Sequence, residues 1–402
     1  RYLILLELGY HYVRFADFNS GAVWTVAGTG GGNPPTSDAN PLLAKVVSPH
    51  AVCFNEDASS MYVACVYAVS RIDMVTATQT RSAIISPTPI IQPRPPNSAR
   101  PGAVTVWAGA TTSGTTDAAG TAARFNTPRH CFAVNESVYV ADALNHKLRR
   151  VDHADDAVTT FAGSGTAGTT NGVGAAAQFN VPRGLVLLSD EATLVVVEES
   201  GHCLRRVDAP TATVSDWLGL CGTSGFAEGT GTTARFNAPH AADRVPFADT
   251  VYVADKDNHR IRSVASATAT TGTVATLFGD GTGASTTARA NAPWALAYRA
   301  ETAAVYWADS VSPRVRFTLV SAAGASSTDF IGDGTAAVTD GVGATAQTTA
   351  WSLLADPRGR FLVLAEGQST HLVRFADYAT AAVWTAVGSG ASGLTSMTAK
   401  LT

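Results

Sequence analysis

Short apolar runs of four to seven residues recur along the whole chain, each bounded by turn-forming residues such as glycine, asparagine and aspartate. The clearest copy, residues 138–151, reads VYVADALNHKLRRV, and residues 251–264 repeat it as VYVADKDNHRIRSV. Each copy predicts a strand, a tight polar turn and a second strand. No stretch keeps a helical period of apolar positions, so the pattern predicts an all-β protein.

The two-strand pattern is part of a longer repeat that holds four short strands. Its copies lie about 55 residues apart, and each closes on a glycine. The clearest unit reads ARFNTPRHCFAV, VYVAD, HKLRRVD and VTTFAG. Four-stranded sheets repeated at this interval are typical of a β-propeller, and we expect residues 1–402 to form one such domain. The closing glycines are Gly28, Gly109, Gly163, Gly219, Gly279, Gly332 and Gly388.

The number of blades depends on how the two ends of the chain meet. The second, third and fourth strands occur seven times, but the first strand has only six clear copies. Residues 1–7, RYLILLE, align with residues 360–366, RFLVLAE, so we expect the chain to begin inside a repeat. A seven-bladed ring closed by residues 389–402 accounts for the length. Six blades and a partial blade are the alternative.

The second unit carries a proline-rich insertion over residues 73–103. Proline has no backbone N–H to donate and cannot pair inside a sheet, so we expect this segment to be an extended, exposed arm. Such an arm can bind in a groove of a partner or can be a tolerated surface insertion. Its prolines are Pro87, Pro89, Pro93, Pro95, Pro96 and Pro101.

Composition limits the functions open to this fold. The net charge of −4 argues against a dominant nucleic-acid-binding face, and no run of 18 apolar residues predicts a membrane span. Five cysteines without a CxxC pair argue against a zinc cluster or a disulfide framework. Cys53 and Cys65 are expected on neighbouring strands, either as one disulfide or as buried thiols. An extracellular or cell-surface location is slightly favoured over a cytoplasmic one.

The repeated residues resemble a known family. The pattern A-x-F-N-x-P, then V-Y-V-A-D, then N-H-[KR]-[LI]-R, then V-x-x-x-[AL]-G is similar to the NHL repeat. The resemblance covers essentially the whole chain and is strongest in the units that end at Gly163, Gly219 and Gly279. It implies a propeller fold. It implies little about activity, because that fold occurs in scaffolds, RNA binders, receptors and a few lyases.

A charged pair recurs in the middle strands of the units. An arginine lies in the third strand of each unit, and an acid ends the preceding strand in six of seven. A catalytic residue is needed once, so we interpret this pair as structural, meeting either across the hairpin or between blades and holding strand ends in register. The pairs are Asp142 and Arg149, Glu198 and Arg205, Asp255 and Arg262, Asp309 and Arg316, and Glu366 and Arg374.

The residue after the first-strand proline differs from unit to unit. The first strand is innermost in a propeller, so these side chains are expected to form a ring at one mouth of the channel. Two histidines, two arginines and two tryptophans can form an anion-binding or aromatic pocket, or they can simply plug the channel. The ring residues are His50, Arg129, Arg183, His240, Trp294 and Trp351.

Three functional hypotheses follow. The first is a non-catalytic scaffold that presents its loops and the proline-rich arm to a protein partner. The second is a lyase or lactonase-like enzyme, which NHL-like lyases suggest, with a metal held by His50, His240 and His130. The third is RNA binding on one face, indicated only by Arg129 and Arg183. The sequence leans towards the scaffold and indicates no cofactor, with zinc or calcium as the weaker alternative.

Overall fold

The computed structural model describes most of the predicted strands, and for those that end before Ala68 it describes the backbone alone. The described residues are 2–7, 12–17, 23–27, 49–54, 60–65, 68–73, 104–110, 112–134, 137–245, 248, 250–265, 271–282, 290–320, 326–355, 361–366 and 373–387.

The first two sheets are antiparallel and are called sheets 1 and 2. Sheet 1 has the order β1-β2-β3 and sheet 2 the order β4-β5-β6-β7. Sheet 1 holds β1 (Tyr2–Glu7), β2 (Tyr12–Asp17) and β3 (Val23–Ala27). Sheet 2 holds β4 (Pro49–Phe54), β5 (Ser60–Cys65), β6 (Ala68–Asp73) and β7 (Val104–Gly109).

Sheets 3 and 4 gain a fifth, very short strand on the outer edge, which pairs with the last strand of the same sheet. Sheet 3 holds β8 (Ala118–Ala119), β9 (Pro128–Val134), β10 (Ser137–Asp142), β11 (Lys147–Asp152) and β12 (Ala157–Ala162). Sheet 4 holds β13 (Gly172–Val173), β14 (Pro182–Leu187), β15 (Thr193–Glu198), β16 (Cys203–Asp208) and β17 (Thr213–Leu218).

Sheets 5 and 7 also have five strands, whereas sheet 6 has four among the described residues. Sheet 5 holds β18 (Gly229–Thr230), β19 (Pro239–Arg244), β20 (Thr250–Asp255), β21 (Arg260–Ala265) and β22 (Thr273–Phe278). Sheet 6 holds β23 (Pro293–Arg299), β24 (Ala304–Asp309), β25 (Arg314–Leu319) and β26 (Thr328–Ile331). Sheet 7 holds β27 (Gly341–Val342), β28 (Ala350–Ala355), β29 (Phe361–Glu366), β30 (Val373–Asp377) and β31 (Ala382–Val387).

Helical structure in the described residues is limited to single 3₁₀ turns, which confirms the all-β prediction. No helix among them is long and apolar enough to cross a membrane. The turns are η1 (Gly120–Ala122), η2 (Ala143–Asn145), η3 (Gly174–Ala176), η4 (Gly231–Thr233), η5 (Lys256–Asn258) and η6 (Gly343–Thr345).

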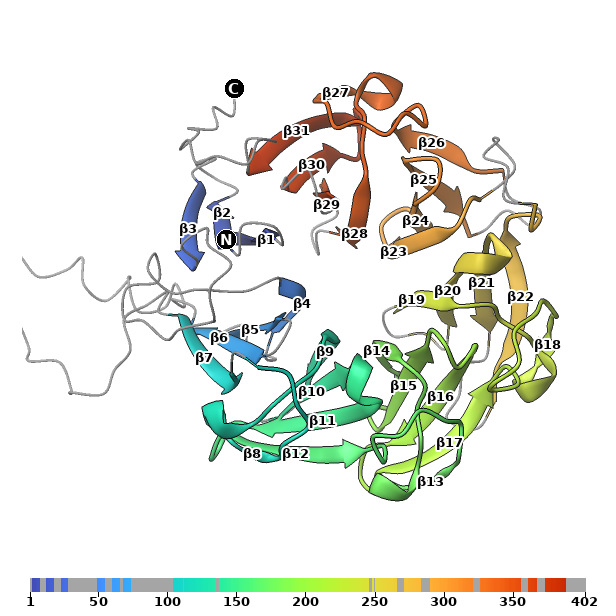
Figure 1. Ribbon diagram of the computed structural model, residues 1–402. Helices are drawn as coiled ribbons and strands as arrows, with labels where there is room; N and C mark the ends of the chain where they lie inside the picture. Colours follow the sequence, from blue (N-terminus) through green and yellow to red (C-terminus); the bar gives the residue numbers. More distant parts are fainter. Residues whose placement is uncertain are drawn as a thin grey trace, which may run out of the picture.

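The sheets surround a central axis as the blades of a β-propeller (Figure 1). The first strand of each of sheets 2 to 7 lies innermost, and neighbouring inner strands contact each other from β4 through β9, β14, β19 and β23 to β28. On the remaining side, β1 contacts β4 of sheet 2 and also β29 and β30 of sheet 7. The three-stranded sheet 1 therefore lies between the first complete sheet and the last one.

The hydrophobic core lies between sheets. Every side chain of β10, β15 and β24 is buried, because these strands have another sheet against both faces. One core cluster joins Tyr139 and Leu148 of sheet 3 to Leu185 and Val196 of sheet 4. This two-sided burial explains why the second strands read as continuous apolar runs rather than as alternating ones.

The closing glycine of the unit that holds sheet 3 has a steric role. Gly163 has a φ of +99°, and a Cβ atom there would lie 2.6 Å from the carbonyl oxygen of His146 and 3.0 Å from the ring of Phe179. Phe179 is the phenylalanine of the A-x-F-N motif and is fully buried. Only glycine permits both the backbone conformation and the close approach.

The backbone register argues against one of the two alternatives for Cys53 and Cys65, the disulfide, and two other expectations lie outside the described residues. Cys53 lies opposite Tyr62 and Cys65 opposite Pro49, so the two cysteines are three residue steps apart in register, about 10 Å. That separation excludes the disulfide between them. Almost all of the 73–103 arm and the whole 389–402 segment lie outside the described residues.

Candidate functional site

The repeated acid and arginine form buried ion pairs within single sheets. Asp142 Oδ2 lies 3.0 Å from Arg149 Nη1, and both side chains are fully buried. The distances are 3.1 Å for Glu198 and Arg205, 2.9 Å for Asp255 and Arg262, and 3.7 Å for Asp309 and Arg316. For the fifth predicted pair, the structure describes only the Arg374 side chain, which pairs with Asp340. Of the two arrangements left open by the sequence, these four pairs adopt the one across the hairpin.

The same arginines also hold the loop that enters their sheet. Arg149 donates to the carbonyl oxygens of Thr116 and Arg124 and forms an ion pair with Asp117 at 2.5 Å. Arg205 donates to Asn171 at 2.6 Å in the equivalent position. Each arginine therefore joins the hairpin of its sheet to the crossing loop, and this network is structural.

Burial shifts the pKa values of the acids of these pairs. It raises the pKa of Asp142 to about 6, although the N–H of Asn126, the Asn145 amide and the Arg149 charge all favour the carboxylate. Burial likewise raises the pKa of Glu198 to about 7. The network is thus strongly desolvated, as expected for a structural part of the buried core and not for a solvent-exposed site.

The histidine at the turn between the second and third strands connects one sheet to the next. His146 Nδ1 accepts a hydrogen bond from the backbone N–H of Val181 in the following unit, at 3.2 Å. His202 and His259 accept equivalent bonds at 3.0 Å from Ala238 and Ala292. Because the three imidazoles form the same hydrogen bond in three units, we interpret them as structural residues.

The ring residues lie at a backbone irregularity that is repeated in six of the sheets. The register between the first and second strands shifts at the ring position, which is the extra residue of a β-bulge. The residue two positions before it has a positive φ: +55° at Thr127, +57° at Val181, +48° at Ala238 and +53° at Ala292. A bulge frees a side chain from the alternation of the strand, and this position is therefore suited to carry function.

Three of the ring side chains are in mutual contact. The His240 and Trp294 rings lie 3.8 Å apart between centres, and His240 Nδ1 is 2.8 Å from the backbone oxygen of Trp294. The guanidinium carbon of Arg183 lies 5.1 Å from the centre of the Trp294 ring. An arginine, a histidine and a tryptophan from three successive sheets thus meet at one end of the channel.

Two charged residues that sequence reasoning missed complete this cluster. Arg183 Nη1 forms an ion pair with Glu199 at 2.7 Å, and Lys256 Nζ lies 5.8 Å from the Trp294 ring centre. Glu199 and Lys256 each directly follow the recurring acid at the end of the second strand. The corresponding residues in sheets 3 and 6 are Ala143 and Ser310. Variation at this one position was the signal that could have identified them.

The electrostatics of the cluster are dominated by positive charge. Arg129 is attracted by the charge of Glu199, which forms its ion pair with Arg183, and is repelled by the charge of Arg183. Burial lowers the pKa of His240 well below its usual value, and the charges of Arg183, Lys256 and Arg129 lower it further. Its Nε2 atom is buried and has no hydrogen-bond partner in the described part of the chain. The site combines surplus positive charge with one unused polar atom.

The metal hypothesis gains no support from the described side chains. No group of three histidines, cysteines or acids among them lies close enough to hold a metal ion. His130 occupies the position after the ring residue, and burial lowers its pKa to about 4. The side chains of His50 and Trp351 lie outside the described residues, so their places in the ring stay predictions.

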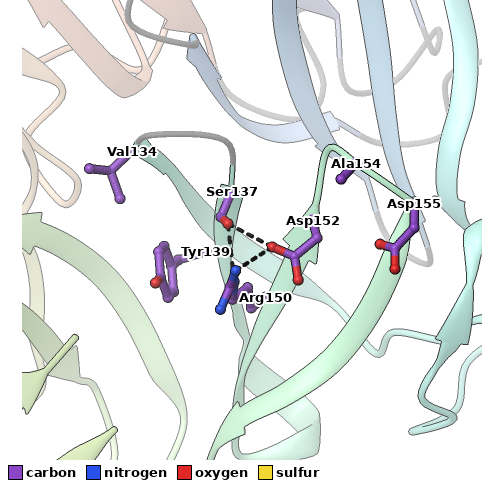
Figure 2. A pocket seen from close by; sticks show the side chains of 7 residues that line it. All are labelled: Val134, Ser137, Tyr139, Arg150, Asp152, Ala154 and Asp155. Carbon is purple, nitrogen blue, oxygen red and sulfur yellow. Dashed lines mark hydrogen bonds and ion pairs between the residues drawn. The ribbon is translucent and has the colours of Figure 1, made fainter. Parts of the chain in front are cut away.

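A second candidate site, a pocket of about 560 Å³, opens at the opposite end of sheet 3 (Figure 2). Its polar groups bind one another: Ser137 donates to Asp152 at 2.8 Å, and Arg150 donates to Ser137 at 3.0 Å and to Asp152 at 2.5 Å. None of the described residues that line the pocket is a histidine that could act as a base towards the serine. We interpret this triad as a support for the turn beside it.

A disulfide fastens the end of sheet 4 on the same side as the ring. Cys203, at the start of β16, is bonded to Cys221, just beyond the end of β17, with their Cα atoms 5.0 Å apart. The pairing of these two cysteines could not be predicted, because no sequence pattern placed the loop after β17 next to β16. Disulfides persist mainly in oxidising compartments.

Comparison with known proteins shows a short match to NHL repeat proteins and a broad match to propeller structures. No family model matches the chain. NHL repeat-containing protein 2 of Bos taurus is 37% identical over 81 residues, which cover 19% of this chain and 11% of the relative. The chloroplastic protein SUPPRESSOR OF QUENCHING 1 of Arabidopsis thaliana is 31% identical over 83 residues, 21% of this chain and 8% of the relative. The matches thus span about a tenth of these relatives.

Solved structures align over almost the whole chain. A 6-phosphogluconolactonase-like protein of Bacteroides fragilis has a TM-score of 0.56 at 10% identity, covering 96% of this chain and 93% of its own. Hydrazine synthase of Kuenenia stuttgartiensis has a TM-score of 0.54 at 12% identity, covering 94% and 92%. At such identities the likeness shows the fold alone. The chain is therefore a β-propeller with a stretch of NHL-like sequence.

Proposed function

We propose that the chain is a non-catalytic interaction propeller of the NHL type, which binds a protein partner at the end that carries the ring. The observation that carries this proposal is a set of exposed apolar side chains in loops at that end, which also carries the charged and aromatic cluster. Four such side chains are exposed by 39% or more: Leu144, Leu220, Phe226 and Val311. We call these four residues the apolar loop set.

Strand register places the apolar loop set at the ring end. Pro128, next to ring residue Arg129, lies opposite Asp142, and Leu144 follows two residues later in η2. Val311 lies in the equivalent turn of sheet 6. Leu220 and Phe226 follow the C-terminal end of β17, which lies at the ring end of sheet 4. Single exposed apolar residues are normal, whereas several on the loops around one charged and aromatic cluster are typical of a binding face.

The proposal extends to the blade count. We propose seven blades, with the three-stranded sheet 1 completed by a strand from the other end of the chain. The contacts of β1 with sheet 2 on one side and sheet 7 on the other support this arrangement.

Affinity capture with the full chain as bait, from an extract of the source cells, tests the proposed face. Leu144→Asp and Phe226→Ser each place a polar group in the apolar loop set and are expected to lower partner recovery by about tenfold, as for a central interface residue. The matched control is Leu319→Asp, because Leu319 is 44% exposed but lies at the opposite end, at the end of β25. Equal recovery with all three variants would remove this face from the proposal.

Deleting residues 77–101 tests the proline-rich arm separately. If the arm contributes to binding, the deletion lowers recovery while the two loop variants still show their own losses. Unchanged recovery assigns binding to the propeller loops alone. Metal analysis of the purified protein examines the enzyme alternative, since stoichiometric zinc or calcium would favour a channel metal site over a scaffold.

A further inference from the structure

The mouth of the channel holds more positive charge than its own carboxylates neutralise. Its cations are Arg129 of β9, Arg183 of β14 and Lys256 of η5. Two carboxylates lie beside them: Glu199 pairs with Arg183 at 2.7 Å, and Asp257 pairs with Lys256 at 2.9 Å. Three cations and two carboxylates leave one positive charge over. That charge belongs to Arg129, whose guanidinium forms no ion pair with any described carboxylate.

One buried polar atom at the cluster is unused. His240 is only 5% exposed, and its Nδ1 atom lies 2.8 Å from the Trp294 carbonyl oxygen. That oxygen can only accept, so Nδ1 carries a proton and the neutral ring presents a bare lone pair at Nε2. This atom has no partner among the described residues, although a buried polar atom is normally hydrogen-bonded.

A negatively charged group resolves both features together. It would neutralise the charge of Arg129 and would favour protonation of His240, because it offsets the cations that now oppose a positive imidazole. The protonated ring would then donate from Nε2, so binding would take up one proton from solvent. The groups that act on the charge of His240 are Arg183, Lys256, Arg129 and the Trp294 carbonyl.

We propose that this cluster of Arg129, Arg183, Lys256, His240 and Trp294 binds the carboxylate of an acidic side chain of the protein partner. The inference rests on the proposed function and deepens it by naming the group that the ring recognises. A single surplus charge matches a carboxylate better than a doubly charged phosphate. The planar guanidinium groups and the indole face match a planar anion.

Calorimetric titration of the full chain with blocked peptides tests the proposal. The acidic probe is acetyl-Gly-Glu-Gly-amide, and its neutral match is acetyl-Gly-Gln-Gly-amide. We expect the glutamate peptide to bind at least about tenfold more tightly, the effect of one charge-assisted hydrogen bond. Arg129→Gln should abolish that preference. Arg150→Gln, at a partly exposed arginine on the opposite end, should preserve it.

The pH dependence separates this site from a general attraction to positive charge. Affinity for the glutamate peptide should rise as the pH falls from about 8 to about 5.5, up to tenfold per unit, because one proton is taken up. His240→Asn keeps a donor near the Trp294 carbonyl but has no titrating nitrogen, so it should flatten this dependence. A steep dependence that persists in His240→Asn would overturn the role of His240.

Two further probes decide the source of the carboxylate. Acetate that binds as tightly as the peptide would overturn the assignment to an acidic side chain, and inorganic phosphate that binds more tightly would overturn the assignment to a carboxylate. No saturable binding of the glutamate peptide, or binding unchanged in Arg129→Gln, would overturn the site. The interaction function would survive that failure if Leu144→Asp still lowered partner capture.

Discussion

His202 Nδ1 accepts a hydrogen bond from the backbone N–H of Ala238, 36 residues further along the chain and in the next unit. Ala238 has a positive φ and directly precedes the proline that begins β19. The same relationship connects His146 to Val181 and His259 to Ala292. A side chain at the turn of one sheet therefore holds the strained residue from which the next inner strand starts.

Removing one of these bonds should weaken the ring of sheets. His202→Ala leaves the Ala238 N–H without its partner and should lower the free energy of unfolding by about 1–2 kcal/mol. Urea denaturation followed by tryptophan fluorescence measures the change. A loss below the error of the measurement would mean that solvent replaces the imidazole without effect.

The same bond should make stability depend on pH. Burial lowers the pKa of His202, because a partly buried ring is harder to charge, although the charge of Asp257 opposes this shift. The unfolded chain therefore binds protons more readily, so this contribution is present above about pH 6.5 and is lost as the pH falls through the lower folded value. His202→Asn retains an acceptor and tolerates the positive φ of 56°, yet does not titrate. Its denaturation midpoint should fall less between pH 7 and pH 5.

Replacing the strained residue Ala238 should have the opposite effect on the free energy of unfolding. Ala238 has a φ of +48°, a conformation that glycine adopts without a steric penalty. Ala238→Gly should therefore raise the free energy of unfolding by up to about 1 kcal/mol, after the larger entropy of the unfolded glycine is subtracted. Ala234→Gly is the control, because Ala234 has a φ of −64°, as in ordinary extended backbone, so this substitution should destabilise the protein. Equal losses in both variants would contradict the role of strain.

The local repeat was readable because it is written many times. The strand-turn-strand copies, the closing glycines and the pairing of Asp142 with Arg149 each follow from recurrence, and the structure shows that pair at 3.0 Å. Recurrence also separated architecture from chemistry, since it assigned the acid and arginine pair to structure. What it could not show was the bond from each turn histidine to the next unit, because the partner is a backbone N–H that has no sequence signal.

Features that occur only once in the chain could not be predicted from the sequence. Glu199 and Lys256 join the ring cluster from turns, and only the curvature of the propeller brings them next to Arg183 and Trp294. The Cys203–Cys221 disulfide depends in the same way on the path of one loop. Single contacts between distant segments are set by three-dimensional packing, which periodicity does not encode.

The buried ion pairs should be sensitive to loss of one partner. Arg149→Met leaves the fully buried Asp142 without its cation and should cost about 3–5 kcal/mol of unfolding free energy. Adding Asp142→Asn to Arg149→Met removes the uncompensated charge while the amide oxygen can still accept from the Asn126 N–H. The double variant should therefore be more stable than Arg149→Met alone. Guanidinium denaturation of the three proteins decides this, and a double variant that is weaker still would contradict the argument.

The disulfide should stabilise the propeller through the loop that it closes. Cys203 and Cys221 are 18 residues apart, and closing a loop of this length in the unfolded chain is worth about 3 kcal/mol. Cys221→Ser should lower the free energy of unfolding by about 2–4 kcal/mol, and dithiothreitol should produce a similar loss in the unmodified chain. Dithiothreitol should have no further effect on Cys221→Ser, which controls for reduction elsewhere in the protein. Thiol labelling of the denatured chain with and without reductant counts the bond directly. If reductant releases no additional thiols, Cys203 and Cys221 are not joined, and the loop after β17 must be held by packing alone.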